Sequence, residues 1–277
     1  PLRHLVAGRE PGVLGQVAGR PFAALLRLLV DLRVHAALPR LASVLGTVHP
    51  ANQLAFLQLA RHGGIQEGLL PVGSAGEAGE RRQPVLELLA EGAAACGAPF
   101  VRVGCPRLYD RPVDYNLLYA EAVEAYGKAL DVLAPHRVKA ALEIHGGTIH
   151  VSAALAHRLV SHWSPDRVCV IYDPQNMVND GYETTELALE LLGPYVGHCH
   201  VGGHRPVEKG KDETGTVQWE WPGVPMAEGL YSFPRMLRKL KVMGYQGFIS
   251  IEDFRPLPLE AKLKEGIAYL RALEGTP

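Results

Sequence analysis

The 277-residue sequence lacks several features that define large classes of protein. No apolar run is long enough to span a bilayer, and the most apolar stretch, residues 22–30, is interrupted by Arg27. The first residues lack the basic region, apolar core and small-residue cleavage site of a secretory signal. We therefore expect a soluble, cytoplasmic protein with no membrane partner.

Cysteine is scarce, and neither sign of charge dominates. With 28 basic and 29 acidic residues, the chain has no net positive field to attract nucleic acid, so we expect no nucleic-acid partner. The cysteines form no C-x-x-C pair and lie in apolar surroundings, which indicates a reducing compartment and buried structural thiols. They are Cys96, Cys105, Cys169 and Cys199.

From residue 65 onward, apolar β-like runs alternate with amphipathic helical segments. This alternation gives six βα units, and residues 202–230 between two of them are expected to form an irregular loop. The patterns predict strands at 69–73, 100–104, 138–145, 168–173, 195–201 and 247–252, and helices at 84–96, 114–133, 152–162, 185–192, 233–240 and 258–273.

The first 64 residues have room for two further βα units, with helices expected at 21–33 and 50–61. Eight units are the number in a closed parallel barrel. The competing architecture, a doubly wound open sheet, usually has a G-x-G-x-x-G turn, which is absent. We predict an α/β fold, a (β/α)8 TIM barrel forming one domain over 1–277, with an atypical or partly missing first pair of βα units.

Polar residues stand at the carboxyl ends of four predicted strands, where a TIM barrel places its active site. They are Glu143, Asp173, His200 and Glu252. Three carboxylates and an imidazole that converge in a cavity repel one another unless a cation neutralises them. Mixed oxygen and nitrogen ligands suit one divalent ion, Mn²⁺, Mg²⁺, Co²⁺ or Zn²⁺.

Each of these residues also has an ordinary structural explanation. Glu143 is compatible with an ion pair to a neighbouring Arg or Lys, and Asp173 followed by Pro174 with the start of a turn. Glu252 is compatible with a solvated strand end or a helix cap. The His198-x-His200 pattern equally describes a partly buried strand whose imidazoles are satisfied. A single metal site explains all four strand ends together.

Four segments carry a resemblance to a known family: LEIHGG at 142–147, YDPQNMV at 172–178, HCHVGG at 198–203 and GYQGFISIEDF at 244–254. Over residues 65–275 the sequence resembles the xylose-isomerase-like TIM barrel superfamily, and more narrowly its sugar phosphate isomerase/epimerase branch. The resemblance implies that one divalent cation is held by the positions of Glu143, Asp173, His200 and Glu252. It also implies that the two glutamates act as acid and base.

The chemistry of these residues fits that function. A metal that polarises a carbonyl and the adjacent hydroxyl makes the neighbouring proton removable and stabilises the resulting enediolate. We therefore expect a metal-dependent isomerase or epimerase with a small sugar or sugar phosphate as substrate. The chain is also a possible homo-oligomer. Candidate substrate-binding residues are His145, Asn176, Arg205 and Trp219.

The sequence departs from the family pattern at three places. Asn176 stands where many relatives have histidine, and Gly202 and Gly203 stand where many have lysine and an acidic or amide residue. Residues 1–64 do not resemble the usual first two βα units. Two alternative functions stay open, an endonuclease IV-like metal-dependent hydrolase and a non-catalytic sugar-binding relative.

Overall fold

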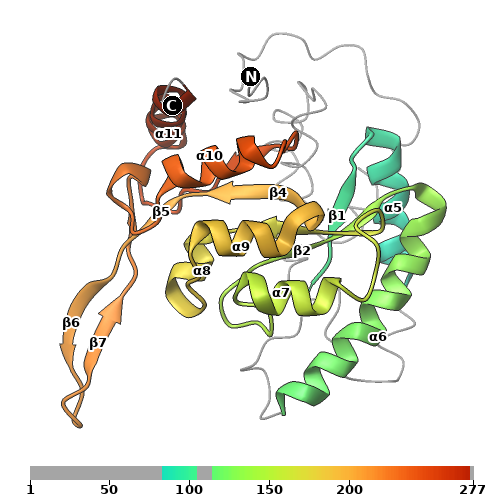
Figure 1. The fold of residues 1–277 in the computed structure, drawn as a ribbon, viewed down its shortest axis with the longest axis horizontal. Coiled ribbons are helices and arrows are strands. Elements are labelled where there is room, and N and C mark those ends of the chain that lie inside the picture. The colour runs from blue at the N-terminus through green and yellow to red at the C-terminus, as the bar shows by residue number, and fades with distance from the viewer. Residues whose placement is uncertain (1–82, 105–113, 275–277) are drawn as a thin grey trace. The chain divides into compact units, whose positions relative to one another are not determined.

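The computed structural model describes residues 83–104 and 114–274, and these divide into two compact units (Figure 1). The N-terminal unit comprises the described part of Gly8–Leu142 together with Leu159–Cys169. The C-terminal unit comprises Glu143–Arg158 and the described part of Val170–Pro277. The strand expected at 69–73, the helices expected at 21–33 and 50–61, and the first two βα units lie outside the described residues. The single domain over 1–277 stays a prediction.

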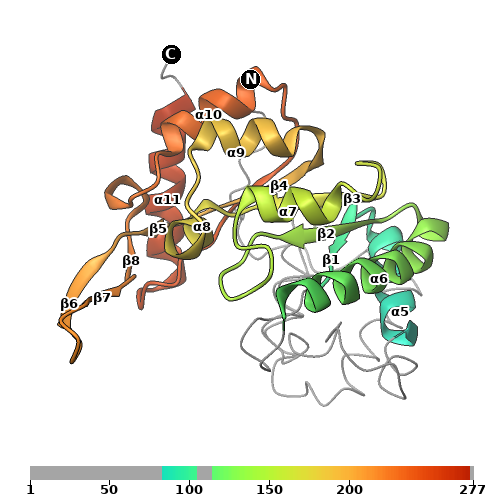
Figure 2. The same cartoon turned by 60° about the horizontal axis from the view of Figure 1, so that its bottom comes forward.

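The described part of the N-terminal unit contains two α-helices and a pair of parallel strands. Helix α6 begins at Asp114, whose carboxylate accepts a 2.6 Å hydrogen bond from the backbone N–H of Asn116, and α5 lies beside it (Figures 1 and 2). Strand β1 pairs with β2 in parallel, with Val101 opposite Ala140. The elements are α5 (Gln83–Cys96), β1 (Phe100–Arg102), α6 (Tyr115–Leu133), the 3-10 turn η3 (Ala134–His136) and β2 (Lys139–Glu143).

The C-terminal unit is built on the parallel strands β3, β4 and β9, which pair in this order. Parallel neighbours require crossover connections, and α8 and α9 link β3 to β4, while α10 lies between β4 and β9 in the chain. The carboxyl ends of the three strands therefore share one edge. The elements are α7 (Ala153–Val160), β3 (Val168–Tyr172), α8 (Pro174–Asp180), α9 (Thr185–Leu192), η4 (Gly193–Tyr195), β4 (Val196–Val201), α10 (Phe233–Val242), β9 (Ile249–Ile251) and α11 (Leu259–Glu274).

The expected irregular loop at 202–230 is wrong in part, because four short strands lie within this segment. Strands β6 and β7 form an antiparallel hairpin that projects away from the rest of the C-terminal unit (Figures 1 and 2). Asp212 closes its turn by accepting the backbone N–H groups of Thr214 and Thr216. The hairpin residues are mostly exposed, so no apolar alternation marks the strands. The elements are β5 (Gly203–His204), β6 (Val207–Lys211), β7 (Val217–Glu220), β8 (Gly223–Val224) and η5 (Met226–Glu228).

Two of the four cysteines can be placed. Cys169 and Cys199 are free and buried, and burial raises the pKa of each thiol to about 12, as expected for structural residues. The side chains of Cys96 and Cys105 lie outside the described part of the structure. None of the described helices combines the length and the apolar composition needed to cross a bilayer.

The α9 helix provides a test of where the core lies. Replacing the fully buried Leu189 by alanine should lower the free energy of unfolding by about 2–5 kcal/mol, because the deletion leaves a cavity. Leu187, two residues earlier on the same helix, is 58% exposed, and its replacement by alanine should cost less than about 0.5 kcal/mol. Urea unfolding of both variants measures the difference, and equal losses would contradict the packing of α9.

Candidate metal centre

Four side chains from the predicted strand ends converge within the C-terminal unit. Glu143 is the last residue of β2, Asp173 follows β3, His200 lies in β4 and Glu252 follows β9. Each offers one ligand atom, and these atoms all lie within 4.8 Å of one another. The structure thus brings together the four residues that the sequence proposed as metal ligands.

The Nδ1 atom of His200 is the common neighbour of the three carboxylates. It lies 3.0 Å from Oε1 of Glu143, 3.4 Å from Oδ2 of Asp173 and 3.5 Å from Oε2 of Glu252. The side chains of His200, Glu143 and Asp173 are buried, whereas that of Glu252 is 11% exposed. Glu252 is therefore the member of the cluster that solvent reaches most easily.

The carboxylates control the protonation of His200. Burial opposes a charged imidazole, but hydrogen bonds to Asp173 and Glu143 and the charge of Glu252 outweigh burial and raise the pKa of His200 to about 10. His198 behaves in the opposite way, because burial and the charge of His200 hold its pKa well below the ordinary value. Its Nε2 lies 2.9 Å from the hydroxyl of Ser250.

The donor set of the cluster fits a divalent cation. When ionised, the three carboxylates carry three negative charges against at most one positive charge on His200, and uncompensated buried charge is costly. Three carboxylates and one imidazole are a ligand set that Mn²⁺, Mg²⁺, Co²⁺ and Zn²⁺ accept. Residues at these four positions could therefore hold one such ion.

Asp173 both starts a helix and contributes to the cluster. Its Oδ1 accepts the backbone N–H groups of Gln175 and Asn176 at 3.0 and 3.1 Å, so Asp173 is the N-cap of α8 and Pro174 is the first helical residue. Its Oδ2, on the side of His200, accepts a 2.6 Å hydrogen bond from Nδ2 of Asn176. The amide expected to contact substrate thus orients Asp173 in this structure.

The structure places three other expected substrate-binding residues outside the cluster. His145 lies in the loop after β2, with Nδ1 2.8 Å from the carbonyl oxygen of Gly146. Arg205 is exposed, and one of its guanidinium nitrogens lies 3.5 Å from Oε2 of Glu228. Trp219 lies on the projecting hairpin and is 55% exposed. The role of all three in binding substrate stays a prediction.

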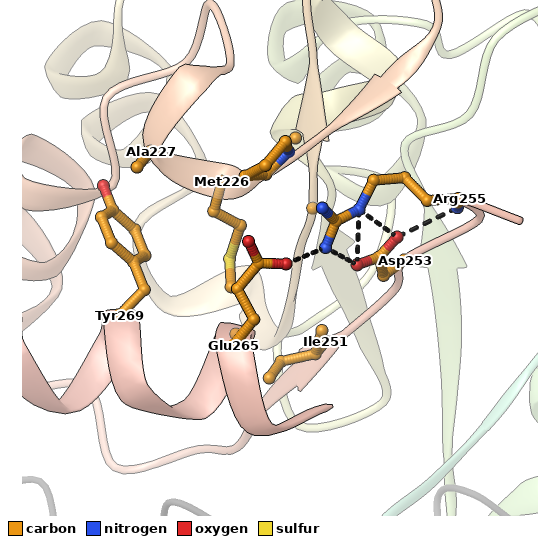
Figure 3. A pocket seen from close by; sticks show the side chains of 11 residues that line it. Met226, Ala227, Ile251, Asp253, Arg255, Glu265 and Tyr269 are labelled. Atoms are coloured by element: carbon orange, nitrogen blue, oxygen red, sulfur yellow. Dashed lines mark hydrogen bonds and ion pairs between the residues drawn. The ribbon is translucent and has the colours of Figure 1, made fainter. Parts of the chain in front are cut away.

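A small cavity of about 60 Å³ lies beside Gly202 and Gly203 (Figure 3). At its edge the guanidinium of Arg255 lies between the carboxylates of Asp253 and Glu265, donating to the former at 3.0 and 2.7 Å. Typical ligand pockets measure about 300–1,000 Å³, so this cavity suits water molecules and not a sugar.

Sequence reasoning missed Gln175, which is 3% exposed and bonded to Asp173. The Asp-Pro pair that precedes it was the available signal, since Asp at an N-cap and Pro at the first helical position are typical of a helix start. That signal would have placed Gln175 in the first turn of a helix beside Asp173.

Comparisons with known proteins identify the family of this fold. A family model described as the xylose isomerase-like TIM barrel matches residues 51–273. No curated protein matches the sequence at a significant level. Solved structures with 15–18% sequence identity to this chain also match it, and at such identities the likeness shows the fold alone.

Three solved structures illustrate that likeness. A xylose isomerase-like TIM barrel protein from Mycobacterium smegmatis in complex with magnesium has a TM-score of 0.56 and 17% identity, covering 82% of this chain and 79% of that one. D-psicose 3-epimerase from Clostridium cellulolyticum H10, solved with D-tagatose, has a TM-score of 0.58 and 15% sequence identity, and the match covers 86% of each chain. The apo form of 3-keto-D-glucoside 4-epimerase from E. coli has a TM-score of 0.54 and 18% sequence identity. The match covers 80% of this chain and 85% of that one.

The raised pKa of His200 predicts a pH-dependent stability in the presence of a chelator. The folded pKa is about 10, whereas an unfolded histidine titrates near about 6.5. The stabilisation should be complete below about pH 6.5 and lost as the pH rises through the folded value. As the pH rises from about 6.5 to about 10, the free energy of unfolding of the parent should therefore fall relative to that of His200→Gln. Urea unfolding measures the difference, and a constant difference would show that His200 is not protonated in the folded chain.

Proposed function

Because the chain belongs to the xylose isomerase-like TIM barrel family, we propose that it is a metal-dependent isomerase or epimerase acting on a sugar or sugar phosphate. The family match establishes the α/β TIM barrel fold class. The observation that carries the proposed activity is the buried cluster of three carboxylates and one imidazole at the strand ends. The sugar epimerases among the structural neighbours support the same chemistry.

The cluster divides into residues that hold the ion and residues that also move protons. Glu143, Asp173, His200 and Glu252 would each supply one ligand atom to a divalent ion such as Mn²⁺, Mg²⁺, Co²⁺ or Zn²⁺. When bound, the ion would polarise the substrate carbonyl and the adjacent hydroxyl. Asp173 accepts three hydrogen bonds from α8, which fix the direction of its carboxylate and suit it to holding the ion.

Glu143 and Glu252 are the proposed acid and base. One carboxylate removes the proton from the carbon next to the carbonyl, and the electron pair of the broken C–H bond forms the enediolate. In an epimerase the other carboxylic acid returns a proton to the opposite face of the same carbon. In an isomerase a proton is returned to the former carbonyl carbon, while the hydroxyl proton moves to the former carbonyl oxygen. The partial exposure of Glu252 supports an approach of substrate from its side of the cluster.

The proposed substrate contacts differ in their support. His145 is two residues beyond Glu143 and is partly exposed. Arg205 pairs with Glu228 at the surface, where such a pair contributes little, so its guanidinium can exchange partners for a substrate oxygen. The side-chain amide of Asn176 has two N–H donors. One is bonded to Asp173, and the other would donate to a substrate oxygen. Trp219 has the least support, because its hairpin projects away from the unit.

The endonuclease IV-like alternative has less support from the structure. A multi-zinc hydrolase needs additional ligands, whereas a single group of three or more His, Cys, Asp and Glu residues able to hold a metal occurs in the described part of the chain. The formal net charge of −1 also offers little attraction for DNA.

Solvent exchange tests the proposed activity directly. With Mn²⁺ in D₂O, the protein should incorporate deuterium next to the carbonyl of at least one member of a panel of free and phosphorylated ketoses, as followed by ¹H NMR. Glu143→Gln and Glu252→Gln should each slow the exchange by about 100-fold or more, because each removes a proton-transfer group. The exposed Glu260→Gln is the matched control, because Glu260 pairs only with Lys264 at the surface of α11 among the residues described, and it should exchange at the parent rate.

Chelation should abolish exchange in the parent, and added Mn²⁺ should restore it. Protein shown to hold the ion that exchanges no ketose would contradict the enzymatic proposal. If such protein bound sugar, and Glu143→Gln/Glu252→Gln bound it equally well, the non-catalytic sugar-binding alternative would be favoured.

A further inference from the structure

We propose that Gln175 is a positioning residue for Glu252, and that residue 202 is glycine because this contact leaves no room for a side chain. The inference rests on the proposed role of Glu252 as metal ligand and proton carrier, and it extends that role to residues outside the cluster. Gln175 is 3% exposed and takes no part in the chemistry proposed above.

Gln175 connects the segments that follow three parallel strands. Its Nε2 donates a 3.4 Å hydrogen bond to the backbone carbonyl of Glu252, after β9. Its backbone N–H donates to Oδ1 of Asp173, after β3, at 3.0 Å. Gly202, the first residue after β4, lies directly against the Gln175 side chain. Gln175 thus links the main chain of Glu252, through its side chain, to Asp173 of the cluster, through its backbone N–H.

Gly202 closes the space around this contact. A Cβ atom at residue 202 would lie 2.2 Å from the carbonyl oxygen of Glu252 and 2.3 Å from Oε1 of Gln175. Cβ atoms do not approach other heavy atoms so closely, so either the carbonyl or the amide would have to move. The φ of Gly202 is not in the left-handed region, so the requirement for glycine is one of space and not of backbone conformation.

The chain on either side of Glu252 is held by separate contacts. The backbone N–H of Glu252 donates to the carbonyl of Val201 at 2.9 Å, which extends the pairing of β9 with β4. Beyond Glu252, Nζ of Lys262 on α11 donates to the carbonyls of Asp253 and Arg255 at 2.6 and 3.1 Å. Between these two anchors, Gln175 donates to the carbonyl of Glu252 itself. The direction of the Glu252 side chain therefore depends on the contacts from Val201, Gln175 and Lys262.

The physical consequence concerns ligand geometry. Sites of this kind must hold their ligands within about 0.5 Å, and groups that orient a ligand change metal affinity by about 10–100-fold when they are removed. Loss of the Gln175 amide should therefore weaken ion binding although no ligand atom is deleted.

The test measures Mn²⁺ binding by EPR, with the metal alone as probe. Gln175→Met retains the length of the side chain and removes its donor, and it should bind Mn²⁺ roughly 10–100-fold more weakly, with an altered line shape of the bound ion. Gln246→Met is the matched control, because Gln246 is an exposed glutamine before β9, and it should match the parent. In the exchange assay Gln175→Met should lower kcat and leave KM unchanged.

Gly202→Ala is a second variant, which retains the Gln175 donor but forces the Glu252 carbonyl or the Gln175 amide to move. It should weaken Mn²⁺ binding in the same way, and thermal unfolding of each variant shows whether it is folded. Parent-like Mn²⁺ affinity and line shape in a folded Gln175→Met or Gly202→Ala variant would overturn the positioning role, while the parent's own binding would still uphold the proposed function. A parent that binds no Mn²⁺ would overturn both.

Discussion

The convergence of three carboxylates on one buried imidazole nitrogen is the contact on which the rest of the C-terminal unit depends. Buried like charges are costly, and a cation bound to this cluster would offset that cost. Parallel strands make the convergence possible, because their carboxyl ends meet at one edge. The capping of α8 by Asp173 adds a second function to one ligand, so local folding and site assembly use the same carboxylate.

The sequence was sufficient to predict that these four residues converge, because they stand at strand ends and apolar runs mark those ends. The same reasoning failed where no buried face generates a pattern, as in the β6–β7 hairpin. It also missed α8, since Asp173-Pro174 was interpreted as a possible turn. The contact of the Gln175 side chain with Glu252 could not be found from local pattern, because that partner is a main-chain carbonyl 77 residues away.

Two of the departures from the family pattern lie in the support of the cluster and leave its four ligands unchanged. Asn176 replaces the histidine of many relatives, and its amide holds Asp173. Gly202 replaces a larger residue and admits Gln175 to the carbonyl of Glu252. Within the family, the four proposed ligands can therefore stay the same while the residues that orient them change. Such changes allow one arrangement of ligands to act on different substrates.

Anomalous diffraction from crystals grown with Mn²⁺ tests the central claim most directly. We expect a single strong peak in the C-terminal unit within bonding distance of Glu143, Asp173, His200 and Glu252. An empty cluster at saturating Mn²⁺, or an ion bound elsewhere while these four side chains point apart, would contradict the assignment of a metal centre to this family member.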